Sequence, residues 1–275
     1  MRQALIGGAI LLLCVVAASG QSYHYQVISV PGSQSTNTAG MNNAAEVVGN
    51  YVPFGGEVSH GFVYNGTGQY SDVYYPGSYF TSPIGINNTG QIVGLYEVGG
   101  VYHGFLFSGG NYTTLDYPRG GTTWLWGIND AGEIIGTSAV AFLYSNGTFT
   151  TLSVPNGRFT TPLAINNNTQ IVGYYDDGQG HPHGFLYSNG TYTTIDFPVV
   201  GQQTVLAGIN NQGVIFGYYT DPGFLNHPFI YENGRFTRLP LRSLQNAYFT
   251  GFNDNGQFVG YYLQPRQVGF LGTPE

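Results

Sequence analysis

Beyond residue 20 the chain consists of short apolar runs, such as QIVGLY and HGFLF, separated by turns rich in Asn, Gly and Pro. No stretch in this part shows the 3.6-residue apolar period of an amphipathic helix. Tyr and Phe are abundant, at 23 and 18 residues, and both favour strands. The pattern predicts an all-β protein.

One ten-residue phrase, GINNTGQIVG at residues 85–94, recurs in similar form five times, which makes six copies in all. Its apolar residue before the Asn pair serves as an anchor for each unit, and the anchors lie 37 to 45 residues apart. The anchors are Met41, Ile86, Ile128, Ile165, Ile209 and Phe252. Periods of this length are typical of solenoids, propellers and other repeat arrays.

Each unit contains four predicted strands: one ending at the anchor, a second like QIVGLY, a third like HGFLY and a fourth like TYTTIDFP. Four antiparallel strands in about 42 residues match one propeller blade. The last unit lacks its fourth strand, and the segment YHYQVISVPG at residues 23–32 resembles that missing strand. Pairing of the two ends would close the ring and remove exposed sheet edges. The sequence predicts a closed six-bladed β-propeller spanning residues 21–275.

The combination of GIN..G.IVG with a His-x-Phe strand resembles the bacterial extracellular HAF repeat family, over essentially all of residues 23–275. The third and sixth units lack the His, and the middle residue is Gly or Pro where the family often has Ala. The resemblance implies export and a repeat β fold, without an activity to carry over.

Residues 1–20 are interpreted as a secretory signal peptide, because one Arg precedes an apolar run from Ala4 to Ala18 and small residues precede Gln21. The only cysteine, Cys14, lies in this segment, so the mature chain would hold no disulfide. We therefore expect a protein that is secreted, at the cell surface or in the periplasm.

Charge is scarce: the seven basic residues are all arginine, against fourteen acidic residues. Phosphate backbones and anionic lipid surfaces require clustered basic residues, so nucleic acid and membrane partners are not expected. We expect a monomer without cofactor or metal, with an extracellular glycan or protein as its partner.

The most repeated residues are interpreted as architecture. An Asn follows every anchor and an Asn or Asp follows that Asn, as in hairpin turns, whereas calcium loops need more carboxylates. A Gly eight residues past each anchor, such as Gly94, predicts a close approach between neighbouring blades. A Thr five residues before five anchors suits backbone capping better than a channel mouth. These threonines are Thr36, Thr81, Thr123, Thr160 and Thr204.

Four histidines share one place at the start of the third strand: His60, His103, His183 and His227. Blade spacing keeps them too far apart to share one metal ion. We favour packing against the Phe two residues later, with a ligand role as the alternative.

The short uniform turns fall on one face of the predicted propeller and the variable loops on the other. Function concentrates in variable loops on a rigid scaffold. Aromatic side chains there suit a sugar ring or an apolar protein surface, although the two tryptophans could equally pack between blades. Together with the histidines, the candidate ligand-binding residues are Tyr79, Phe80, Arg119, Trp124, Trp126 and Tyr248.

No sequence motif of a known catalytic nucleophile, metal protease or nucleotide site occurs, and no catalytic residue is predicted. The leading hypothesis is therefore a binding module for a glycan or protein. A hydrolase or lyase that uses loop carboxylates and acts on a polysaccharide is one alternative, and a structural component of a surface or matrix is the other.

Overall fold

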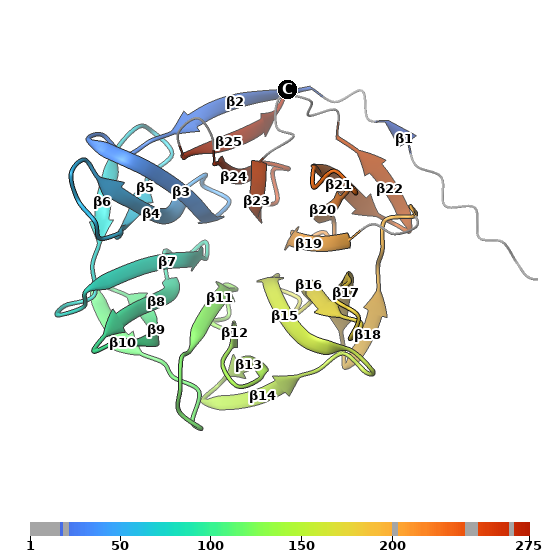
Figure 1. Ribbon diagram of the computed structural model, residues 1–275, viewed down its shortest axis with the longest axis horizontal. Helices are drawn as coiled ribbons and strands as arrows, with labels where there is room; N and C mark the ends of the chain where they lie inside the picture. Colours follow the sequence, from blue (N-terminus) through green and yellow to red (C-terminus); the bar gives the residue numbers. More distant parts are fainter. Residues whose placement is uncertain (1–16, 19–21, 200–202, 240–246, 264–266) are drawn as a thin grey trace, which may run out of the picture.

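The structure is a computed structural model that describes residues 17–18, 22–199, 203–239, 247–263 and 267–275. Six antiparallel sheets stand around a central axis, each with one strand near the axis and one at the rim (Figure 1). This confirms the predicted six-bladed β-propeller with four strands per blade.

The blades follow one another along the chain. Blade 1 holds β3 (Ser33–Met41), β4 (Val47–Pro53), β5 (His60–Tyr64) and β6 (Tyr70–Val73). Blade 2 holds β7 (Phe80–Ile86), β8 (Ile92–Val98), β9 (Val101–Ser108) and β10 (Asn111–Thr114). Blade 3 holds β11 (Trp124–Ile128), β12 (Ile134–Thr137), β13 (Ala141–Ser145) and β14 (Thr148–Leu152).

Blade 4 holds β15 (Arg158–Ile165), β16 (Ile171–Asp176), β17 (Pro182–Ser188) and β18 (Thr191–Thr194). Blade 5 holds β19 (Gln203–Ile209), β20 (Ile215–Thr220), β21 (Asn226–Glu232) and β22 (Arg235–Arg238). Blade 6 holds β23 (Ala247–Phe252), β24 (Phe258–Tyr262), β25 (Val268–Pro274) and, from the start of the chain, β2 (Tyr23–Ile28).

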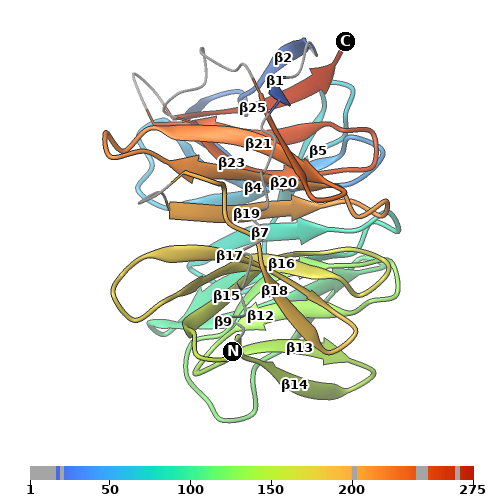
Figure 2. The same ribbon diagram turned by 90° about the vertical axis from the view of Figure 1, so that its right-hand side faces the viewer.

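The ring closes as the sequence predicts. Strand β2 pairs antiparallel with β25, from Tyr23 opposite Pro274 to Ile28 opposite Gly269. Strands run between the two faces of the disc, so connections gather on two sides (Figure 2). We call the side with the Asn-rich turns the uniform-turn face and the opposite side the variable-loop face.

The predicted signal peptide lies mostly outside the described residues. Its two described residues form β1 (Ala17–Ala18), which pairs parallel with β22.

The core lies between blades. Two successive residues of each second strand are buried, as with Val47 and Val48 in blade 1, because a neighbouring blade covers each face of the sheet. The Phe of each third strand is at most 2% exposed. These residues are Phe62, Phe105, Phe142, Phe185, Phe229 and Phe270. This double-sided burial explains the unbroken apolar runs in the sequence.

The first Asn of each turn has two tasks. In blade 2, Asn87 Oδ1 accepts hydrogen bonds from the backbone N–H groups of Thr89 and Gln91, which fixes the turn. Its Nδ2 donates to the carbonyl oxygen of Asn129 in blade 3, at 2.9 Å. Equivalent inter-blade bonds begin at Asn42, Asn129, Asn166 and Asn253.

The second residue of each turn forms an unbroken ring. Its backbone N–H donates to the side-chain oxygen of its counterpart in the next blade, at 2.7 to 3.0 Å, six times around the axis. The ring members are Asn43, Asn88, Asp130, Asn167, Asn211 and Asp254. The repeated dipeptide therefore joins the blades as well as turning the chain, a role that the sequence analysis missed.

Two further predictions have definite outcomes. Each of the five threonines accepts a hydrogen bond from a backbone N–H of the preceding loop, which confirms capping.

The repeated glycines of the second strands do allow a close approach, but the approach is within one blade. A Cβ on Gly94 would lie 2.1 Å from the carbonyl oxygen of Ser82 and 3.0 Å from the Phe105 ring. The expectation of contact between blades at these glycines was wrong, because the inner strand bulges toward them.

Replacing Asn87 by Ala should lower the free energy of unfolding by about 1–3 kcal/mol more than Asn65→Ala does. Asn65 is a matched control, because it is exposed and its Oδ1 accepts from Thr67 and Gln69 in the same turn geometry. Denaturant unfolding of both variants measures the difference. Equal losses would show that the inter-blade bond adds nothing to the turn.

Asp130 gives the ring a pH dependence. Burial favours a higher pKa, but hydrogen bonds from the Asn88 and Asn167 side chains and the Asn88 backbone lower the pKa below its ordinary value. A carboxylate with a lowered folded-state pKa stabilises the fold above its unfolded pKa, about 3.9, and this stabilisation is lost as pH falls through the folded-state pKa. Relative to Asp130→Asn, the wild type should lose stability as the pH is lowered from about 4 through the folded-state pKa of Asp130. Equal changes in the free energy of unfolding of the two proteins as the pH falls would contradict this.

Candidate ligand-binding face

The axis of the propeller is a funnel that opens on the variable-loop face. Its wide end is a cavity of about 480 Å³. Further along the axis two smaller cavities follow. The first, of about 80 Å³, is surrounded by the six anchor residues, and the second, of about 70 Å³, by the hydrogen-bonded ring of turn residues, which we call the Asn ring. A ligand of appreciable size therefore has room only at the variable-loop face.

Inner strands supply most of the funnel wall, and one position of the second strand supplies four more of its residues. The residue directly after the invariant second-strand glycine is Asn50, Leu95, Thr137, Tyr174, Tyr218 or Tyr261, depending on the blade. Four of them, Asn50 and the three tyrosines, line the funnel. Burial raises the pKa of Tyr218, and the nearby Tyr174, Tyr261 and Tyr248 raise it further. Variation at one position beside an invariant glycine was the sequence signal that could have identified this wall.

The two tryptophans lie on the inner strand β11 of blade 3, stacked with ring centroids 5.4 Å apart. Both are half-buried. Trp126 packs against the core between blades 3 and 4, and its Nε1–H donates to Thr137 Oγ1 at 2.9 Å. It also lines the funnel. Trp126 therefore packs between blades, which is one of the two roles that the sequence left open, and its role in ligand binding stays a prediction.

A second cavity, of about 430 Å³, lies between blades 3 and 4 on the same face. It exists beside the blade whose second strand is shortest, since β12 has 4 residues where β8 has 7. Seven of its lining side chains carry hydroxyl groups. They are Thr137, Ser138, Thr151, Ser153, Thr160, Thr161 and Tyr174. Trp126 and Tyr174 line this cavity and the funnel alike.

Phe159 lies at this inter-blade cavity in a strained conformation. Its φ is 49° and its side chain is 81% exposed. The register of β15 against β16 shifts between Arg158 and Thr161, so a bulge presents the ring. A bulky residue with positive φ is uncommon and costs free energy. Such strain is found most often at binding and catalytic sites.

The repeated histidines lie outside the linings of these two cavities. Each ring lies against the Tyr of the second strand, as in the stacked pairs Tyr96–His103 and Tyr175–His183. The Phe two residues later lies on the same face of its strand as the His, and Tyr51 makes ring contacts with both His60 and Phe62. Direct packing of the His against that Phe stays a prediction.

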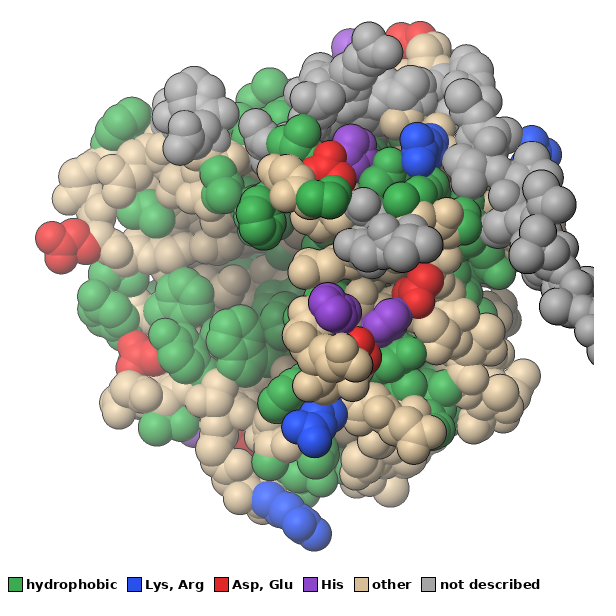
Figure 3. All heavy atoms as spheres, turned by 45° about the vertical axis from the view of Figure 1, so that its right-hand side comes forward, with side chains coloured by type: hydrophobic (Ala, Val, Ile, Leu, Met, Phe, Trp, Pro, Cys, Tyr) green, Lys and Arg blue, Asp and Glu red, His purple; other side chains and the backbone are tan. Residues whose placement is uncertain are grey.

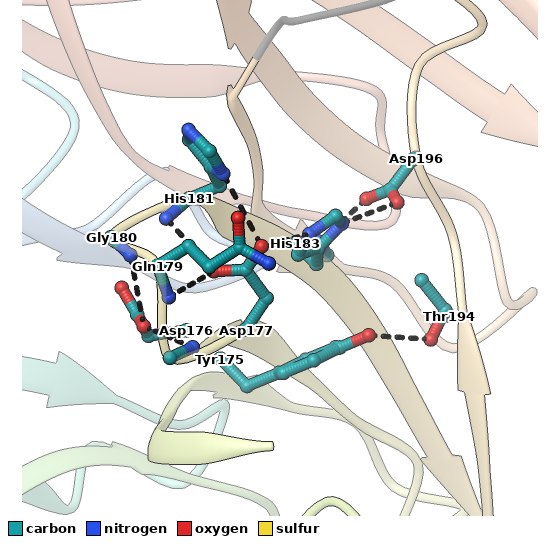
Figure 4. Close-up of polar contacts among 11 residues, drawn as sticks. Tyr175, Asp176, Asp177, Gln179, Gly180, His181, His183, Thr194 and Asp196 are labelled. Carbon is teal, nitrogen blue, oxygen red and sulfur yellow. Dashed lines mark hydrogen bonds and ion pairs between the residues drawn. The ribbon is translucent and has the colours of Figure 1, made fainter. Parts of the chain in front are cut away.

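Aspartates contact three of the four repeated histidines, His103, His183 and His227, as Figure 4 shows for His183. His183 Nδ1 lies 2.7 Å from Asp196 Oδ2, and Asp196 Oδ1 accepts from the Gly184 N–H. His103 and Asp116 repeat this arrangement. In blade 5, His227 instead contacts Asp221, and that hydrogen bond is the main reason for the lowered pKa of Asp221.

The remaining candidate residues are spread over the face. Tyr248 lines the funnel and stacks on Tyr261. Phe80 makes an edge contact with Tyr102, which in turn lies beside Trp124. Tyr79 and Arg119 are exposed and lie outside the linings of the two cavities.

Exposed apolar side chains concentrate on the variable-loop face. Phe224 and Phe159 are the most exposed, followed by Phe54 and Tyr79, and all four lie on this face. Val27 on the rim strand β2 is the exception at this level of exposure. Figure 3 shows hydrophobic side chains around a central hollow and histidines beside acidic side chains.

No protein-family model matches the sequence, and no curated protein sequence matches it. Solved structures do resemble it. A mutant of AofleA from Arthrobotrys oligospora superposes with a TM-score of 0.57 at 12% identity, covering 95% of this chain and 92% of that chain. The SapL1 lectin in complex with alpha methyl fucoside gives 0.55 at 12% identity, covering 83% and 88%.

TolB from Acinetobacter baumannii gives a TM-score of 0.54 at 15% identity and covers 74% of this chain. This chain spans about half of the TolB chain, at 52%. These likenesses establish the class: the protein is a β-propeller. Within the described residues, no helix is long and apolar enough to cross a membrane.

Substituting Phe159 by Asn should leave the protein as stable as the wild type, or stabilise it by about 1 kcal/mol, because Asn tolerates positive φ. Phe224→Asn is the matched control, since Phe224 has a φ of 62° and is 86% exposed but lies outside the two cavities. Denaturant unfolding compares the two. Destabilisation by Phe159→Asn alone would show that the Phe159 ring supports the fold.

Proposed function

We propose that the variable-loop face binds a neutral glycan, with Trp126 at the centre of the site. The carrying observation is the inter-blade cavity of about 430 Å³, in which an indole and seven hydroxyl side chains come together. This size falls within the range of about 300–1,000 Å³ for small-molecule sites. An aromatic face beside hydroxyl donors and acceptors matches the apolar face and polar rim of a pyranose ring.

The charge of the site favours an uncharged ligand. Among the described residues that line the funnel and the inter-blade cavity, none is charged. An anionic ligand buried there would lose its hydration without gaining an ion pair, which is costly. Neutral sugars avoid this cost because their hydroxyl groups pair with Ser, Thr, Tyr and Asn side chains.

Two lines of support come from outside the cavity. SapL1, in complex with a fucoside, and the Aleuria aurantia lectin, in complex with Fucalpha1-6GlcNAc, share the fold. The predicted signal peptide at residues 1–20 would bring the protein out of the cytoplasm, where it could meet extracellular glycans.

Binding has more support than hydrolysis. Carboxylate-dependent glycosidases need two carboxyl groups about 5 to 9.5 Å apart beside the substrate. The loop carboxylates of Asp176 and Asp177 instead accept hydrogen bonds from backbone N–H groups of their own loop. The carboxylate of Asp221 does the same in its loop. They therefore fix the loops of blades 4 and 5.

Trp126→Ala should lower affinity for the neutral glycan selected on a glycan array by at least about tenfold, which corresponds to 1.4 kcal/mol. Phe159→Asn should weaken binding by a smaller factor. Array screening followed by isothermal titration calorimetry measures both effects. Because Trp126 also packs in the core, Trp126→Phe provides a milder variant that keeps an aromatic ring but loses the indole N–H.

Phe224→Asn is the control for changes at exposed loop tips and should bind as the wild type does. Near-ultraviolet circular dichroism verifies the fold of each variant. Failure of the wild type to bind any neutral glycan, or unchanged binding by folded Trp126 variants, would refute the proposed function.

A further inference from the structure

The funnel and the inter-blade cavity are separate spaces with a common wall. Each has a volume suited to a small molecule, about 480 and 430 Å³. Trp126 and Tyr174 line both, one from blade 3 and one from blade 4. A ligand that fills both must therefore pass these two side chains.

We propose that the two cavities are adjacent subsites for a single oligosaccharide, whose chain crosses Trp126 and Tyr174. This inference rests on the proposed glycan-binding function and specifies its ligand as two or more linked neutral sugars. A monosaccharide fills one cavity and leaves the other empty.

Each cavity is lined by a residue with a buried side-chain atom that makes no hydrogen bond. Asn37 lines the funnel and Ser138 lines the inter-blade cavity. Within the described part of the chain, Asn37 Oδ1 and Ser138 Oγ are buried and accept or donate no hydrogen bond. An unsatisfied buried polar atom costs about 1–3 kcal/mol. A sugar hydroxyl that reached either atom would give it a partner without replacing an existing hydrogen bond of that atom.

The strand lengths explain why an oligosaccharide could pass from one cavity to the other between blades 3 and 4. Strand β12 ends at Thr137 and β13 begins at Ala141, so the hairpin of blade 3 stops early. The neighbouring hairpin of blade 2 continues to Val98 and Val101. The short hairpin lowers the wall between the axis and the rim. Phe159, presented by its bulge, lies on the other side of the same cavity.

The inference predicts that affinity depends on chain length. Calorimetric titration of the full chain uses neutral cello-, malto-, xylo- and fuco-oligosaccharides of one to six residues, together with the neutral glycans selected on the array. Affinity should rise at least tenfold from the monosaccharide to the shortest chain that fills both cavities. It should then level off.

The two unpartnered side chains locate the subsites. Ser138→Ala and Asn37→Ala should each lower the affinity for the longer oligosaccharide by about three- to tenfold. A monosaccharide should be sensitive to only one of the two. Thermal unfolding verifies both variants, and the length series on the wild type tests the inference independently of any substitution.

The outcomes separate the two proposals. If monosaccharide and oligosaccharide bind equally well and both require Trp126, the glycan-binding function stands and the two-subsite inference is wrong. The inference is also wrong if the long ligand responds to only one of the two substitutions. If no neutral saccharide of any length binds, the function and the inference both fail.

Discussion

The closed circle of hydrogen bonds between turn residues is the constraint on which the rest of the structure depends. Each of its six bonds joins a backbone N–H to a side-chain oxygen of the next blade. At about 0.5–1.5 kcal/mol each, the six contribute roughly 3–9 kcal/mol, comparable with the whole stability of an ordinary domain. Because every blade both donates and accepts, the circle is complete only with six blades in place.

The two faces of the propeller differ because only the uniform-turn face is closed by this circle of hydrogen bonds. On the uniform-turn face the cavity within the ring of turn residues measures about 70 Å³, well below the usual size of a small-molecule site. The inner strands open toward the other face, where the blades are held by loops that differ in length and sequence. Polar satisfaction is almost complete at the first face, whereas two unsatisfied side chains line cavities at the second.

Blade 3 is where the repeat departs from its own pattern. It has the shortest second strand and both tryptophans, and like blade 6 it lacks the third-strand His. The short hairpin of blade 3 accompanies a cavity between blades 3 and 4, which Trp126 and Phe159 both line.

The sequence by itself determined the blade number, the four strands of each blade, the closure by β2 and the capping threonines. Each of these follows from local chemistry repeated in register, so spacing alone reveals it. Only the tertiary structure decided which residues meet between blades. The Asn ring, the Tyr–His–Asp contacts and the cavity shared by Trp126 and Tyr174 join residues of different strands or blades. Their distances depend on how the sheets twist and pack, which no single repeat records.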